Sequence, residues 1–146
     1  MEPVRVFIQR TGGAEYYGFG KYCASMSYVE ELPFGSSGNG NTVEETKQDF
    51  LNSVEESKEY LAKEGIPLPE DLRFEFFYDV PSFLAYYSGK LTLAGLERIT
   101  GVARGQLSRY VTGRRNPSYR TVEKIEKALH KFGEDLSHVN LFCQGD

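Results

Sequence analysis

The chain has 146 residues, with 17 basic and 21 acidic side chains and a formal charge of −4. This balance excludes a generic polycation, and no apolar run approaches the length that crosses a membrane. The first residues, MEPVRVFIQR, lack the charged-then-apolar layout of a signal peptide. Cys23 and Cys143 lie far apart and in no metal-ligand spacing, so we expect reduced thiols, no metal, no cofactor and a cytoplasmic protein.

The charge is divided unequally along the chain. Residues 1–80 carry 7 Lys and Arg against 15 Asp and Glu, a formal charge of −8. Residues 81–146 carry 10 basic against 6 acidic side chains, or +4, and the balance reaches +7 within residues 82–132. Such asymmetry is expected when two domains serve different partners. We therefore predict an acidic domain over residues 1–79 and a domain over residues 82–146 that favours phosphates.

The N-terminal half predicts a small α+β domain. Alternation of Val4, Val6 and Ile8 predicts a first strand, and a Thr-Gly-Gly turn at residues 11–13 leads to a return strand over residues 15–22. A short strand or loop follows, and a last alternating segment predicts a strand over residues 72–78. This order predicts one helix covering one face of a small antiparallel sheet.

The helix of this half begins at a capping box. Thr42 supplies a capping hydroxyl and Glu45 a carboxylate three residues on. Gly65 ends the helix and Pro67 prevents its continuation. The apolar residues that we expect on its buried stripe are Val43, Phe50, Leu51, Val54 and Leu61.

Signs of catalysis or metal binding in the chain are weak. The glycines at 35, 38 and 40 lack a following Lys-Ser/Thr, so we interpret them as a flexible loop rather than a phosphate cradle. His130 and His138 have no partner at ligand spacing, and no nucleophile motif appears. The carboxylates that follow the capping box indicate a solvated or partner-facing surface more than a metal cluster: Glu44, Glu45, Asp49, Glu55, Glu56 and Glu59. We expect a protein without enzymatic activity.

The segment from Leu91 to Leu129 predicts a helix-turn-helix followed by an amphipathic helix. Thr92 is a candidate N-cap for a first helix, which Gly101 ends. Val102 and Leu107 are spaced to bury against that helix, leaving the polar residues of the second helix outside. The second helix of such a motif lies in the DNA major groove. The alternative is a plain helical hairpin whose arginines are merely solvated.

An exposed basic turn follows the second helix. Gly113 ends that helix, and three polar residues lead to Pro117. We predict base contacts from the second helix and phosphate contacts around it, since arginine bonds guanine bidentately and exposed turns suit phosphates. The predicted base contacts are Arg104, Gly105, Gln106 and Arg109. The predicted phosphate contacts are Thr92, Ser108, Arg114, Arg115 and Asn116.

These residues resemble the Xre/phage-repressor class of helix-turn-helix domains. The likeness is carried by Leu93-x-x-Leu96, Thr100-Gly101-Val102, Leu107-Ser108-Arg109, Gly113-Arg114-Arg115-x-Pro117-Ser118, Lys124-Ile125 and Ala128-Leu129. The resemblance implies that Arg104, Gly105 and Arg109 contact bases. This chain departs from the class at Glu97, where a small alanine is usual, at Leu93, often a glutamine, and at Ala103, usually a Ser/Thr cap.

The N-terminal half, followed by such a domain, resembles the HicB family of antitoxins. The likeness is carried by Gly38-x-Gly40-x-Thr42-x-Glu44-Glu45, the following helix and Gly65-x-Pro67-x-Pro69. The resemblance implies a truncated RNase H-like domain that blocks a small basic toxin, the mRNA-cleaving ribonuclease HicA. It also implies that the C-terminal domain binds the promoter of its own operon. Residues 21–33 are longer than the family pattern.

We therefore predict an antitoxin of a type II toxin–antitoxin system that represses its own operon. Alternatives are a stand-alone transcription regulator whose acidic half senses a small molecule and, less favoured, a degenerate nuclease. One recognition helix reads few base edges, which favours a homodimer or larger even assembly on DNA. The apolar tail over residues 136–142 either extends the helical core or pairs with its symmetry mate.

Overall fold

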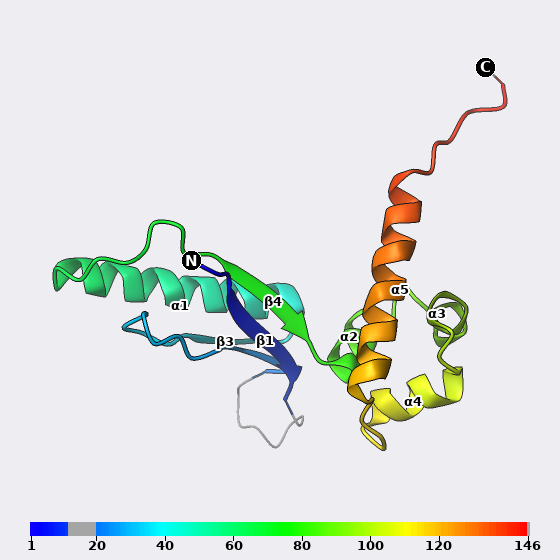
Figure 1. Ribbon diagram of the computed structural model, residues 1–146, viewed down its shortest axis with the longest axis horizontal. Helices are drawn as coiled ribbons and strands as arrows, with labels where there is room; N and C mark the ends of the chain where they lie inside the picture. Colours follow the sequence, from blue (N-terminus) through cyan, green and yellow to red (C-terminus); the bar gives the residue numbers. More distant parts are fainter. Residues whose placement is uncertain (12–19, 146) are drawn as a thin grey trace. The chain divides into compact units, whose positions relative to one another are not determined.

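The computed structural model describes residues 1–11 and 20–145, which form two compact units that divide between Phe83 and Leu84 (Figure 1). The first unit is a four-stranded sheet with one long helix, and the second is helical. The predicted α+β fold followed by an all-α domain is therefore confirmed. The strands are β1 (Val4–Arg10), β2 (Tyr22–Met26), β3 (Ser37–Gly40) and β4 (Phe74–Tyr78). The helices are α1 (Val43–Lys63), α2 (Val80–Tyr86), α3 (Leu93–Thr100), α4 (Arg104–Thr112) and α5 (Tyr119–Ser137).

The sheet is mixed rather than antiparallel. Its strand order is β3-β2-β1-β4, and β1 pairs antiparallel with β2 but parallel with β4. The prediction of an antiparallel sheet was thus wrong for its last strand. A parallel neighbour requires a crossover connection, and α1 provides it by carrying the chain from β3 at one edge to β4 at the other.

The described return strand extends beyond the end that the sequence indicated. β2 begins at Tyr22, which pairs with Arg10, and its register runs to Met26 opposite Val6. Residues 12–19, which include most of the predicted turn and of the predicted return strand, lie outside the described residues. Of the residues of β2, only Tyr22 lies in the predicted return strand; the others lie in the segment for which the sequence predicted a short strand or loop.

Helix α1 begins where the capping box predicted. The Thr42 hydroxyl accepts a hydrogen bond from the Glu45 backbone N–H at 3.1 Å, and the Glu45 carboxylate accepts one from the Asn41 N–H at 3.0 Å. Phe50 is fully buried and meets the rings of β4 edge-on, with a centroid distance of 5.2 Å to Phe74. Leu51 is 38% exposed, because the next position along a helix is turned by about 100° from the buried stripe.

The glycine-rich segment contains a packed strand rather than only a flexible loop. Gly38 is buried in β3, directly beneath the backbone of α1. A Cβ at Gly38 would lie 2.4 Å from the Phe50 backbone N and 2.7 Å from the Thr46 carbonyl oxygen. Glycine is therefore required here for close approach of helix and sheet.

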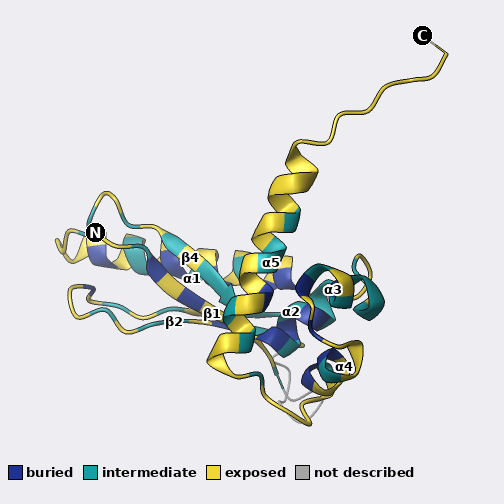
Figure 2. Ribbon diagram, turned by 45° about the vertical axis from the view of Figure 1, so that its right-hand side comes forward, coloured by how far each residue is buried: buried dark blue, intermediate teal, exposed yellow. Residues whose placement is uncertain are grey.

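The second unit has its own apolar core. Leu96 of α3, Leu107 and Tyr110 of α4 and Ile125 of α5 are each at most 4% exposed. Towards its C-terminal end α5 loses this cover, and the tail beyond it is exposed (Figure 2). No helix among the described residues has the length and hydropathy needed to cross a membrane.

Candidate nucleic-acid interface

The turn between α3 and α4 is held by local hydrogen bonds. Thr92 caps α3, its hydroxyl accepting from the Gly95 N–H at 3.0 Å, and Gly101 ends the helix at a positive φ of 74°. Thr100 is buried, and its hydroxyl donates to the Leu96 carbonyl at 2.7 Å and accepts from the Val102 N–H at 3.1 Å. Both predicted helix ends, at Thr92 and Gly101, are confirmed. The two helices are therefore held in a defined orientation.

One face of α4 is open to solvent. Arg104, Gly105, Ser108 and Arg109 are exposed, whereas Leu107 is fully buried. At about 100° per residue these four exposed positions fall on one side of the helix. At Gly105 no atom lies within 4 Å of where a Cβ would stand, so another molecule can approach the backbone closely. The open face therefore groups two arginines around a small, accessible stretch of helix.

Gln106 lies differently from the other predicted base contacts. It is half-buried, and it falls at the flank of the open face, on the side towards buried Tyr110. Its side chain therefore reaches the open face only from the edge.

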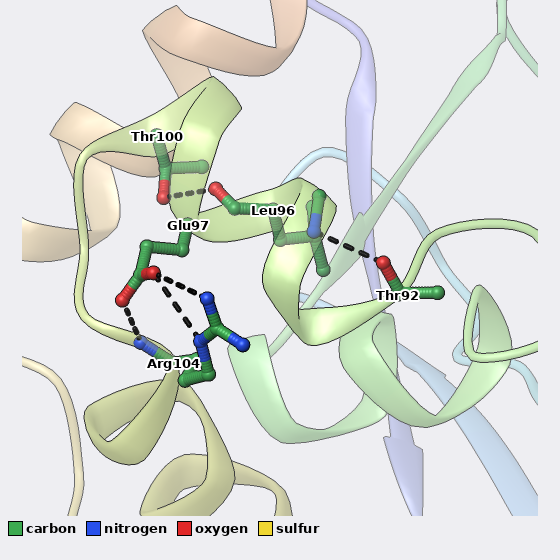
Figure 3. A network of polar contacts seen from close by, with 6 residues as sticks. Thr92, Leu96, Glu97, Thr100 and Arg104 are labelled. Carbon is green, nitrogen blue, oxygen red and sulfur yellow. Dashed lines mark hydrogen bonds and ion pairs between the residues drawn. The ribbon is translucent and has the colours of Figure 1, made fainter.

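The first turn of α4 is capped by a residue from α3. Ala103 occupies the N-cap position without a side-chain hydrogen bond. Glu97 supplies the missing acceptor, because its Oε2 accepts a hydrogen bond from the Arg104 backbone N–H at 2.7 Å. Its Oε1 accepts from the Arg104 side chain, at 3.3 Å from Nε and 3.2 Å from Nη2 (Figure 3). Two departures from the class pattern, at positions 97 and 103, thus compensate each other.

These bonds also affect the ionisation of Glu97. The hydrogen bond from the Arg104 backbone N–H, followed by those from its side chain, lowers the pKa of Glu97 below its ordinary value. A lowered pKa means that the charged carboxylate is favoured in the folded protein. Its contribution to stability is present at neutral pH and is lost as the pH falls through that lowered pKa.

The basic turn after α4 is tied to the helix end. Gly113 ends α4 at a positive φ of 77°, as predicted. The carbonyl oxygen of Arg109 accepts backbone hydrogen bonds from Arg114 at 3.0 Å and from Arg115 at 3.4 Å. Arg114, Arg115 and Asn116 are all exposed. The turn therefore presents two guanidinium groups beside the open face of α4 on a backbone that is held in place.

Sequence reasoning missed two kinds of residue at this surface. Glu97 appeared as a misfit, although the absence of a capping side chain at Ala103 was a signal that another residue supplies the acceptor. Tyr119 is 81% exposed and Arg120 is exposed in the first turn of α5, directly after the basic turn. Their position after the Ser118 N-cap marks them as further candidates for phosphate contacts.

The remaining candidate residues are the acidic side chains and histidines that could bind a metal. Among residues 1–11 and 20–145 there is no group of three His, Cys, Asp or Glu side chains placed to hold a metal ion. The six carboxylates of α1 named above are exposed. Lys47 lies over the rings of Phe76 and Tyr78, and Lys58 pairs with Glu55 at 3.2 Å. The solvent-facing side of α1 is therefore predominantly acidic.

A comparison with protein families places a helix-turn-helix match at residues 88–131. The matched residues include α3, α4, the basic turn and the part of α5 that packs on them. Searches of curated proteins and of solved structures gave no match. The match and the geometry of the turn agree: the C-terminal unit is a helix-turn-helix domain, the kind with which transcription regulators bind DNA.

Proposed function

We propose that the chain is an autorepressing antitoxin, with a C-terminal unit that binds operator DNA and an N-terminal unit that occludes a small basic toxin. The observation that carries the DNA-binding part is the open face of α4, flanked by the basic turn, within the helix-turn-helix match. The HicB resemblance and the acidic charge of the first 80 residues support the toxin-binding part.

The open face and its surroundings divide into two sets of DNA contacts. Arg104 and Arg109 read bases from α4, Gly105 admits the base edges, and Gln106 contributes from the flank. The remaining contacts grip phosphates on either side of the groove: Thr92, Ser108, Arg114, Arg115 and Asn116. Backbone contacts of this kind fix the register of α4 on the duplex, and the base contacts supply the sequence preference.

The arrangement of the N-terminal unit supports its proposed role. Three antiparallel strands, a crossover helix and a fourth strand parallel to the first agree with the truncated RNase H-like fold that the resemblance implies. The acidic outer side of α1 is complementary to a basic ribonuclease. Long-range attraction between such surfaces speeds encounter and weakens as salt screens it. We assign the two activities to residues 1–79 and 82–146; the two compact units divide slightly later, between Phe83 and Leu84.

We expect the two activities to separate in full-length variants. Glu56→Lys/Glu59→Lys reverses two exposed charges on α1, and cells that express a neighbouring open reading frame for a basic toxin are expected to lose protection while operon repression stays normal. Arg109→Ala/Arg115→Ala is expected to show the reverse pattern. Growth assays and a promoter reporter measure the two readouts.

Two results would count against the antitoxin. If Arg109→Ala/Arg115→Ala loses repression and neither variant changes growth, the stand-alone regulator is favoured. A small molecule that changes operator binding, in a host without a neighbouring toxin gene, favours the sensing alternative directly.

We also expect the protein to bind DNA as a homodimer through its C-terminal end. Leu136 and Val139 are more than half exposed, and Leu141 and Phe142 are 91% and 87% exposed, so the tail does not extend the core of its own chain. A second copy covers these side chains and places two α4 helices about 34 Å apart on an inverted repeat. Light scattering on the full chain and on a chain ending at Glu134 is expected to give a dimer and a monomer. Monomers in both, protecting a single non-palindromic site, would refute this assembly.

A further inference from the structure

The side chain of Glu97 bridges α3 and α4 at the N-terminal end of the open face. It bonds both the backbone and the guanidinium of Arg104, seven residues later, at 2.7 to 3.3 Å (Figure 3). The Arg104 side chain nevertheless stays 60% exposed. One carboxylate therefore controls a residue that is still available to a partner.

The backbone bond performs the task of a cap. Ala103 has an N-cap backbone, with φ −57° and ψ 136°, but no side-chain acceptor. The first N–H groups of a helix have no partner within the helix, and an acceptor there stabilises it. Glu97 supplies that acceptor together with a negative charge at the positive end of α4. A purely structural role for Glu97 requires only this bond to the backbone N–H of Arg104.

The side-chain bonds go further, because they select which edge of the guanidinium remains open. Arginine has five N–H donors, arranged on a side edge of Nε and Nη2 and an end edge of Nη1 and Nη2. Glu97 occupies the side edge at 3.3 and 3.2 Å. The end edge is left to a ligand, and two parallel donors match the O6 and N7 acceptors of guanine. Pairing before DNA arrives also lowers the entropy cost of ordering Arg104.

We propose that Glu97 is a specificity-determining positioning residue, which holds Arg104 with its end edge presented to a guanine. This inference rests on the proposed base contact of Arg104. Glu97 touches no base itself and acts through the arginine. The pair with Arg104 also neutralises a carboxylate that otherwise repels the phosphates of the duplex.

The test uses the full-length protein and a duplex that the wild-type protein selects from a randomised pool. Binding to that duplex is compared with a scrambled duplex and with duplexes in which each G·C pair is replaced in turn. Glu97→Ala is expected to lower the ratio of selected to scrambled binding about tenfold, as for loss of one bidentate contact. The preference is expected to vanish at the same G·C pair that Arg104→Ala affects. The double variant is expected to match Arg104→Ala alone.

Two variants separate positioning from other effects. Glu126→Ala removes an exposed carboxylate from α5 of the same unit and is expected to strengthen scrambled binding without changing the ratio. Glu97→Ala/Ala103→Ser restores a capping hydroxyl, so its thermal midpoint is expected to recover while the ratio stays low.

Three outcomes overturn the inference. If the hydroxyl introduced by Ala103→Ser restores the ratio along with the midpoint, Glu97 is only a cap. If Glu97→Ala keeps the preference at the pair that depends on Arg104, the arginine needs no positioning. If Arg104→Ala itself keeps every base preference, the proposed base contact fails, and the inference fails with it.

Discussion

Gly38→Ala is expected to destabilise the N-terminal unit by about 3 kcal/mol or more, the upper range for overpacking a well-filled site. The added Cβ would lie 2.4 Å from the Phe50 backbone N, 2.7 Å from its Cα and 2.7 Å from the Thr46 carbonyl oxygen. All three atoms belong to the backbone of α1, so no side chain can rotate away to relieve the contact. Helix and sheet must separate instead. Thermal unfolding of the full chain is expected to show the midpoint of the N-terminal unit lowered by more than about 10 °C.

Gly35→Ala is the matched control for this change. It lies in the same glycine-rich segment, but no atom stands within 4 Å of the position that its Cβ takes. Its unfolding transition is expected to coincide with that of the wild-type protein. If Gly38→Ala and Gly35→Ala are equally stable, α1 does not lie on β3 at the distance described, and the packing of the first unit is wrong.

The ends of the helices could be predicted from sequence because their causes are local. Thr42 and Thr92 each cap a helix by accepting an N–H three residues on, and Gly101 and Gly113 each end one at positive φ. Such features depend on a few neighbouring residues and on the φ range that only glycine enters easily. Local spacing likewise predicted the buried side of α4 and its exposed side, except at Gln106, which is half-buried.

The direction of β4 could not be predicted in this way. Its alternating residues identify a strand but do not say which neighbour it joins or in which direction. The parallel pairing with β1 depends on α1 crossing the sheet, a long-range event with no mark in the strand itself. The burial of Gly38 has the same origin, because a glycine that permits close approach and one in a loop look alike in sequence.

Glu97 could not be interpreted from the sequence for a different reason, because two deviations from the class pattern are informative only together. Taken singly, a glutamate at 97 and an alanine at 103 both weaken the likeness to the helix-turn-helix class. The folded turn brings the carboxylate within 2.7 Å of the Arg104 N–H, so the first residue supplies what the second lacks. A sequence pattern that is compared one position at a time therefore does not detect such a compensating pair.

Arg104→Ala/Arg109→Ala is expected to abolish sequence-specific DNA binding. Each arginine is exposed on the open face of α4, and each good bidentate contact to a base is worth about 1–3 kcal/mol. If the two contributions add, the double variant loses about 2–6 kcal/mol of binding free energy on the selected duplex. On a scrambled duplex it loses only the sequence-independent attraction of two positive charges to the phosphates. Titrations of both duplexes at one stated salt concentration measure the difference. Circular dichroism is expected to be unchanged, since neither side chain contributes to the core.

Arg115→Ala gives the contrasting result that makes this test specific. Arg115 is exposed in the basic turn, with only its backbone N–H tied to α4 through the Arg109 carbonyl. We expect weaker binding to selected and scrambled duplexes alike, and a slope of log affinity against log salt that is smaller by about 0.9 for one lost phosphate contact. The ratio between the two duplexes is expected to stay as in the wild-type protein. If the double variant instead keeps the wild-type ratio and Arg115→Ala lowers it, the basic turn reads the bases and α4 only grips the backbone.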